Sequence, residues 1–114
     1  MAADTTSGGT PTVSPDTVSV ADPADVWFQY SLTNSGDEDD TTTGFYITVE
    51  DSSGTFINSD YAPDDTIPAG GTIEQGVKVE ASLIGGLTPG DFWVSLRGPN
   101  GGDTLSAALL TVTD

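Results

Sequence analysis

Residues 26–36, V-W-F-Q-Y-S-L-T-N-S-G, decide the fold of this protein. Over most of this stretch polar side chains alternate with apolar ones, and the alternating apolar residues are Val26, Phe28, Tyr30 and Leu32. A period of two residues is typical of a β-strand that buries one face. The last three residues, N-S-G, tolerate the backbone angles of a turn. We therefore predict the central strand of a β-sandwich, followed by an acidic loop.

The same alternation recurs along the chain, with turn residues between the repeats. The predicted strands lie at residues 11–15, 16–20, 26–33, 43–50, 55–57, 73–79, 91–97 and 104–113. Long connections at residues 58–71 and 83–89 are typical of a chain that crosses from one sheet to another. We predict an all-β protein with seven or eight antiparallel strands, folded as an immunoglobulin-like Greek-key β-sandwich.

Local irregularities are expected in two strands. Leu109 and Leu110 are adjacent, so the apolar residues of the last strand do not share one parity, and a bulge near residues 107 and 108 would reconcile them. Gly76 indicates a bulge or a close approach of another chain segment. No stretch shows the apolar spacing of an amphipathic helix, so we expect essentially no α-helix.

At 114 residues the chain has the size of a single domain, and no change in composition divides it. We expect this domain at residues 11–114. Residues 1–10 are polar and rich in Thr, Ser and Gly, which predicts a lead that is flexible or held by a partner. The lead lacks the basic and apolar regions of a signal peptide, and no apolar stretch is long enough for membrane insertion.

The charge balance is strongly acidic. The chain has 18 Asp and Glu residues against 2 Lys and Arg residues, for a net charge of -16. Nucleic acid and anionic lipid are therefore repelled as partners. Three explanations remain open: a saline habitat that screens the charges, calcium loading of an extracellular protein, or a surface that needs solubility.

The composition also excludes most catalytic chemistry. Cysteine and histidine are absent, which removes disulfides, thiolate or imidazole metal sites and nucleophiles activated by histidine. Almost all carboxylates lie in predicted turns or at outward strand positions, whereas acid–base catalysis needs a carboxylate whose pKa is raised by burial in a cleft. We therefore expect a protein that is not an enzyme and that carries no cofactor, with calcium as the one candidate ion.

Four turn motifs resemble one known family. They are S-L-T-N-S-G-D at residues 31–37, D-S-S-G-T at 51–55, I-P-A-G-G-T at 67–72 and L-T-P-G-D-F-W-V-S-L at 87–96. Together they are similar to the bacterial and archaeal cell-adhesion-related immunoglobulin-like domains called CARDB, over roughly residues 13–113. The resemblance implies a non-catalytic, extracellular module of a cell surface. A virion decoration protein with the same fold is the alternative, because the sequence holds one such unit.

Acidic residues gather in two predicted loops. Carboxylates that converge from both loops would be suitable ligands for calcium. The spacing of an EF-hand is absent, which favours solvated loops over an ion site. The candidate ligands are Asp37, Asp39, Asp40, Asp64 and Asp65.

Three aromatic residues fall at outward strand positions. Tyr46 and Trp93 are expected near each other on one outer face, and the only arginine, Arg97, lies further along the strand of Trp93. Aromatic rings beside an arginine are typical of an interface hot spot. Trp27 is expected on the opposite sheet, near Lys78. Three interpretations stay open: cover by the protein's own chain, an interface with protein subunits of a larger assembly, or a platform for a glycan.

Overall fold

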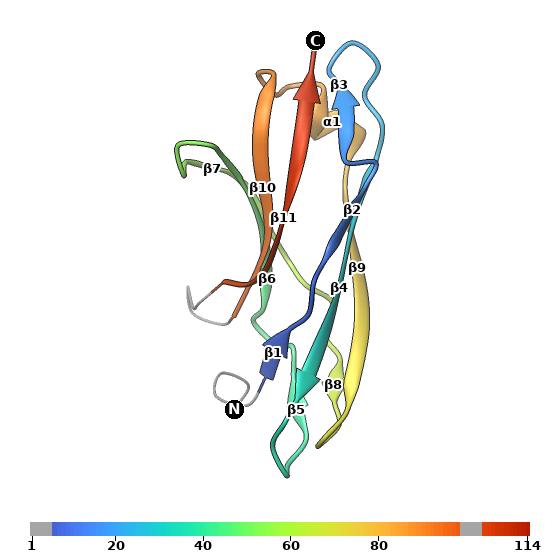
Figure 1. Ribbon diagram of the computed structural model, residues 1–114, viewed down its shortest axis with the longest axis vertical. Coiled ribbons are helices and arrows are strands. Elements are labelled where there is room, and N and C mark those ends of the chain that lie inside the picture. Colours follow the sequence, from blue (N-terminus) through green and yellow to red (C-terminus); the bar gives the residue numbers. More distant parts are fainter. Residues whose placement is uncertain (1–5, 99–103) are drawn as a thin grey trace.

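The computed structural model describes residues 6–98 and 104–114, and its principal dimensions are 48 × 22 × 19 Å (Figure 1). Nearly all regular elements are β-strands, which confirms the predicted all-β class. Among the described residues one short helix, α1 (Ala81–Ile84), interrupts them, in agreement with the expectation of essentially no α-helix. Within the described ranges no helix is long and apolar enough to cross a bilayer.

The four-stranded sheet is built around β4 (Val26–Asn34), which contains the alternating residues Val26, Phe28, Tyr30 and Leu32. Two short strands, β1 (Thr6–Gly8) and β2 (Thr12–Ser14), pair with successive parts of β4 along one side. On its other side β4 pairs with β9 (Thr72–Val79). All these pairings are antiparallel, so β4 is the central strand that its alternation predicted.

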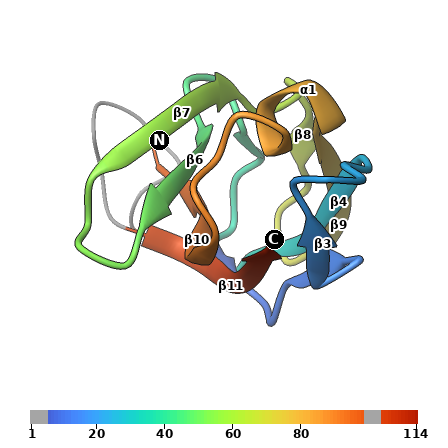
Figure 2. The same ribbon diagram turned by 90° about the horizontal axis from the view of Figure 1, so that it is seen from above.

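The second sheet has five strands and lies across the core from the first (Figure 2). Four neighbouring strands pair antiparallel, and β3 pairs parallel with β11. In sheet order the strands are β3 (Thr17–Ser19), β11 (Thr104–Thr113), β10 (Gly90–Arg97), β6 (Tyr46–Asp51) and β7 (Phe56–Tyr61). A separate two-stranded sheet pairs β5 (Asp40–Thr41) with β8 (Thr66–Ile67).

The predicted split of the first strand is confirmed. β2 belongs to the four-stranded sheet and β3 to the five-stranded sheet, with Pro15 between them. The lead differs from expectation, because residues 6–8 form β1 on the domain's own β4. The part of the lead at residues 1–5 lies outside the described residues.

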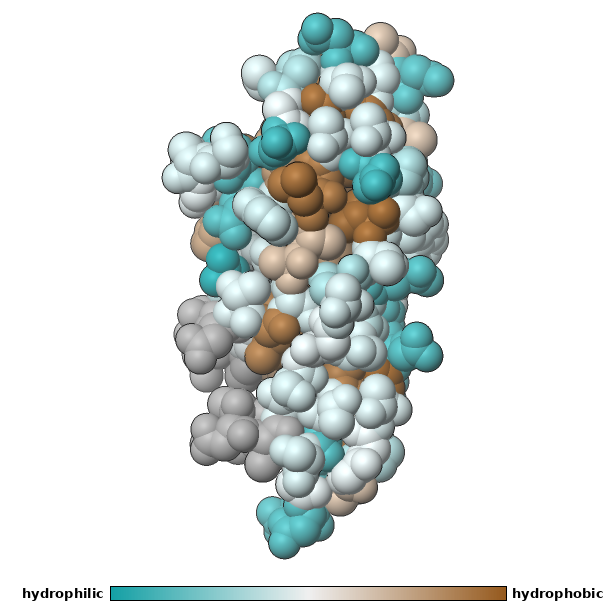
Figure 3. Space-filling model, in the orientation of Figure 1, coloured by the Kyte–Doolittle hydropathy of each residue, from teal (hydrophilic) through white to brown (hydrophobic). Residues whose placement is uncertain are grey.

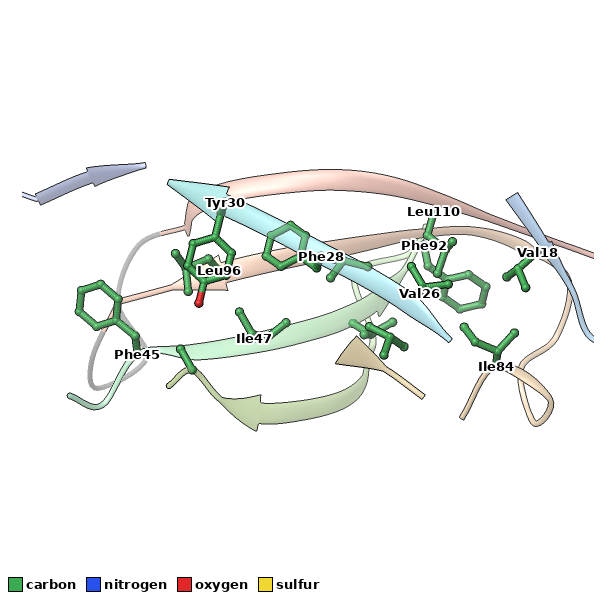
Figure 4. Close-up of a cluster of buried hydrophobic side chains, with 14 of the residues drawn as sticks. Val18, Val26, Phe28, Tyr30, Phe45, Ile47, Ile84, Phe92, Leu96 and Leu110 are labelled. Carbon is green, nitrogen blue, oxygen red and sulfur yellow. The ribbon is translucent and has the colours of Figure 1, made fainter. Parts of the chain in front are cut away.

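The core lies between the two main sheets, and Figure 4 shows its side chains converging from both. From β4 the inward residues Val26, Phe28 and Leu32 have no exposed surface. The five-stranded sheet contributes the buried residues Ile47, Val49, Phe92, Val94, Leu96, Leu110 and Val112. The inward residues predicted on β4, Tyr30 included, are thus confirmed, whereas Val77 of β9, on the same face as the buried Val79, is only partly buried at the side of the cluster.

Of the two predicted irregularities, the bulge of the last strand falls at another residue, and Gly76 marks a close approach of β4. The register of β10 and β11 shifts where Leu96 pairs with Ser106 and Arg97 pairs with Thr104, so the extra residue is Leu105 and not residue 107 or 108. With the bulge there, Leu110 faces the core and Leu109 faces solvent. β9 pairs with β4 without a register shift, so Gly76 marks no bulge.

We predict that Phe28→Ala or Phe92→Ala lowers the free energy of unfolding by about 3–5 kcal/mol, because each change leaves a cavity in the core. The matched control is Phe56→Ala, which removes a ring that is 56% exposed and should cost less than about 1 kcal/mol. Urea unfolding measures all three. Equal losses at Phe28 and Phe56 would contradict the assignment of the core.

Tyr30 provides a second test, because burial raises the pKa of its hydroxyl to about 12. In the unfolded chain a tyrosine ionises near pH ~10. The folded state therefore holds the proton more strongly, and its stability should fall as the pH rises from about 10 to 12. The urea midpoint should fall less over this range in Tyr30→Phe, which cannot ionise. An identical fall in both proteins would show that other groups cause the alkaline loss.

Candidate functional site

The outer face of the five-stranded sheet, here called the five-strand face, carries a row of large side chains across four strands. Glu50 of β6 lies opposite Phe56 of β7 and also opposite Trp93 of β10. Trp93 in turn lies opposite Leu109 of β11. Phe56, Trp93 and Leu109 are 56%, 44% and 43% exposed. Hydrophobic surface over β11 is visible in Figure 3.

Arg97 holds the polar groups of this face together. Its Nη2 donates to Oε1 of Glu50 at 3.1 Å, and its Nε donates to Oγ1 of Thr48 at 3.4 Å. The guanidinium carbon lies 5.2 Å from the centre of the Phe56 ring, a cation–π distance. Thr48 is fully buried although its position faces outward, in keeping with its contact with Arg97. The charged groups here are therefore paired with one another.

The expected contact between Tyr46 and Trp93 is not present. Both residues belong to the five-strand face, but Tyr46 lies opposite Arg97 and Tyr61, whereas Trp93 lies opposite Glu50. Glu50 is four residues from Tyr46 along β6, a separation of about 13 Å in a strand. The register between the strands decides the neighbours, and the sequence of a single strand does not contain it.

Sequence reasoning missed three exposed members of this face: Phe56, Tyr61 and Leu109. Leu109 alternates with the buried residues Leu110 and Val112, so its position in the strand could have predicted that it faces outward. Residues 56–61 offered no such indication. All six residues of β7 are exposed, so the strand has no buried side that an alternation of apolar and polar residues could reveal.

The outer face of the four-stranded sheet, here called the four-strand face, carries Trp27. This residue is 48% exposed and lies opposite Lys78 of β9, as predicted. On its other side it lies opposite Ser14 of β2. Lys78 is also 3.8 Å from the carboxylate of Asp25, but both side chains are largely exposed, and such pairs contribute little stability.

The two acidic loops lie side by side, because β5 pairs with β8 and the backbone N–H of Thr42 donates to the carbonyl of Asp65 at 3.0 Å. Several of their carboxylates accept hydrogen bonds from the protein itself. Asp40 is buried and accepts from Oγ1 of Thr6, and Asp39 accepts from the backbone N–H of Ala69. Asp65 accepts from its neighbour Thr66.

The remaining candidate ligands, Asp37 and Asp64, are exposed. In the described part of the chain, no three acidic side chains are grouped as a metal ion would require. The calcium site stays a prediction.

No protein-family model matches the sequence, and no curated protein matches it. Solved structures match its fold. The alkylpurine DNA glycosylase AlkC of Pseudomonas fluorescens, bound to DNA with an abasic site analog, matches with a TM-score of 0.74 at 13% identity, over 96% of this chain and 30% of its own.

Two β-glucosidases show the same kind of match. EmGH1 of Erythrobacter marinus has a TM-score of 0.69 at 13% identity, over 95% of this chain and 15% of its own. β-Glucosidase 3B of Thermotoga neapolitana has a TM-score of 0.68 at 12% identity, over 96% of this chain and 16% of its own. The chain thus spans less than a third of each of these enzymes, and the likeness concerns the fold alone.

The net charge of -16 generates a prediction on stability. The melting temperature should rise steadily with NaCl, because screening weakens repulsion among carboxylates that have few cationic partners. Melting curves in NaCl, and in CaCl2 at matched ionic strength with a chelator control, measure the effect. If the melting temperature rises only with calcium, the stabilisation comes from a bound ion and not from screening. The ligands would then be Asp37, Asp39, Asp40, Asp64 and Asp65.

Proposed function

We propose that this protein is a non-catalytic structural module that joins a protein partner in an extracellular assembly through its five-strand face. The observation that carries this proposal is the row of Phe56, Trp93 and Leu109, large apolar side chains that stay about half exposed across three strands of one sheet. The assembly is a cell-surface layer or a virion surface, in a saline habitat.

The proposed fold is an immunoglobulin-like Greek-key β-sandwich, similar to CARDB domains. The strand pairing supports it. β4 and β9 correspond to strands B and E of one immunoglobulin sheet, and β6, β10 and β11 correspond to C, F and G of the other. β7 then takes the place of the additional strand C′ beside C.

The absence of catalysis in this proposal rests on composition. The chain has no histidine or cysteine, so catalysis would depend on its carboxylates. A catalytic acid needs a raised pKa, which burial or a neighbouring like charge produces. Hydrogen bonds from Ser53 and Thr55 lower the pKa of Asp51, the opposite of what a catalytic acid needs. The matched enzymes contain this fold as 15–30% of their chains, which is consistent with a part that accompanies other domains.

A protein is the best partner for the five-strand face because its polar groups are already paired. Arg97 binds Glu50 and Thr48, so these groups offer few free donors or acceptors to a polar ligand. The exposed rings and Leu109 would contribute about 25 cal/mol for each Å² that a partner buries. Tryptophan, phenylalanine and arginine together are the composition of interface centres.

We predict that Trp93→Ser combined with Leu109→Thr abolishes attachment to the assembly and leaves folding unchanged, because both side chains are exposed at the centre of the proposed interface. Rebinding to native particles or layers that have been stripped of this protein measures attachment, and circular dichroism measures folding. Trp27→Ser, on the opposite face, is the matched control and should rebind normally.

Normal rebinding of the double variant would overturn the interface. If the double variant failed to fold and the wild type never associated, the rings would serve the domain's own packing. Oxidative footprinting adds an independent readout, since Trp93 should be protected in the assembly and Trp27 should not.

A further inference from the structure

The four-strand face differs in chemistry from the five-strand face. Beside the row of Ser14, Trp27 and Lys78, a second row crosses the three strands and places Gln29 between Thr12 and Gly76. Next along β4, Ser31 lies opposite Glu74. One exposed indole therefore borders a field of hydroxyl, amide and carboxylate groups.

Gly76 lines a hollow in this field and brings Trp27 close to it. A Cβ atom at this position would lie 3.3 Å from Cγ of Gln29 and 3.8 Å from the ring atom Cε3 of Trp27, so the missing side chain lets Gln29 and the indole lie close against the backbone of β9. The hollow has a volume of about 360 Å³. It is lined by residues 29–31 of β4, by residues 74–76 of β9 and by Thr10 and Thr12, and Trp27 lies beside this lining, next to Gly76.

These polar side chains are available to a ligand. Among the residues that the structure describes, the side chains of Thr12, Gln29 and Glu74 make no hydrogen bond to another protein group, and neither does the indole N–H of Trp27. Arg97 and Glu50 on the five-strand face are paired with each other, so the two faces differ in their free hydrogen-bonding capacity. A ring with free donors and acceptors around it suits a ligand that is both flat and rich in hydroxyl groups.

We propose that the hollow at Gly76, with Trp27 at its border, binds a neutral saccharide. The apolar face of a sugar ring packs on the indole, and its hydroxyl groups bind Gln29, Thr12 and Glu74. Tryptophan offers both a large apolar surface and a polar N–H for such a ligand. The charge of -16 repels sulfated and uronic-acid glycans, which restricts the ligand to neutral sugars. This site goes beyond the proposed function, because it lies on the opposite sheet and needs no part of the five-strand face (Figure 2).

The two tryptophans of the chain make the test direct, since they lie on opposite faces. In Trp93→Phe the only indole is Trp27, and in Trp27→Phe the only indole is Trp93. Each full-length variant is titrated with cellotriose, maltotriose, mannotriose and chitotriose, up to about 10 mM, which detects millimolar dissociation constants. A heparin trisaccharide is the anionic control.

The expected result is a saturable change in the fluorescence of Trp93→Phe with at least one neutral trisaccharide, and no change in Trp27→Phe. Gly76→Val in the Trp93→Phe background should push Gln29 and the indole away from their places beside the hollow and weaken binding at least about tenfold. Its folding should be preserved or improved, because valine favours a strand more than glycine does and the nearest atom belongs to the flexible side chain of Gln29. A loss of binding without loss of stability separates a ligand contact from a structural role.

Three results would overturn the proposal: no saturable change with any neutral trisaccharide of the panel, equal binding of the heparin trisaccharide, or unchanged affinity in Gly76→Val. None of these results bears on the proposed interface, because attachment through Trp93 and Leu109 is measured separately in the rebinding experiment.

Discussion

The inward row of β4 ends on an amide, and the arrangement of one end of the molecule depends on it. Asn34 follows Leu32 on the same parity and has no exposed surface. Its Nδ2 donates to the carbonyls of Glu38 at 2.7 Å and Ile67 at 3.1 Å, and its Oδ1 accepts from the N–H of Gly36 at 2.9 Å. A buried amide without these partners would be costly, so the position that ends the strand also fixes the acidic loop and β8.

The alternation of β4 has a second consequence on its other side. Each residue that points into the core places its neighbour on the four-strand face, so burial of Val26 and Phe28 is what exposes Trp27. β10 repeats this relation, where burial of Phe92 and Val94 exposes Trp93. Strand alternation thus exposes both indoles. Their surroundings differ, because Trp93 lies beside Leu109 and the paired Glu50. Trp27 lies near Lys78 and Gly76.

Properties of single strands could be predicted from the sequence, and properties of several strands together could not. Alternation identified β4, most of the core and the outward position of each tryptophan, and the prolines identified the split between β2 and β3. The neighbours of Tyr46 and the bulge at Leu105 depend on the register between strands, which loop lengths and packing decide. Likewise, the stacking of Arg97 on Phe56 and the hollow at Gly76 exist only when three or more strands lie side by side.

The two cationic side chains lie on different faces of the molecule, and each affects the chemistry of its own face. With 18 acidic residues in the chain, Arg97 and Lys78 cannot neutralise its surface, and each instead acts on one face. Arg97 is partly buried and binds Glu50, so it removes charge from the centre of the five-strand face and leaves an apolar row that a protein can cover. Lys78 stays exposed beside Trp27 with only a loose pairing to Asp25, so the four-strand face keeps its capacity for polar ligands. Since the whole chain repels polyanions, the partners that we propose are a protein without strong negative charge for the five-strand face and a neutral sugar for the four-strand face.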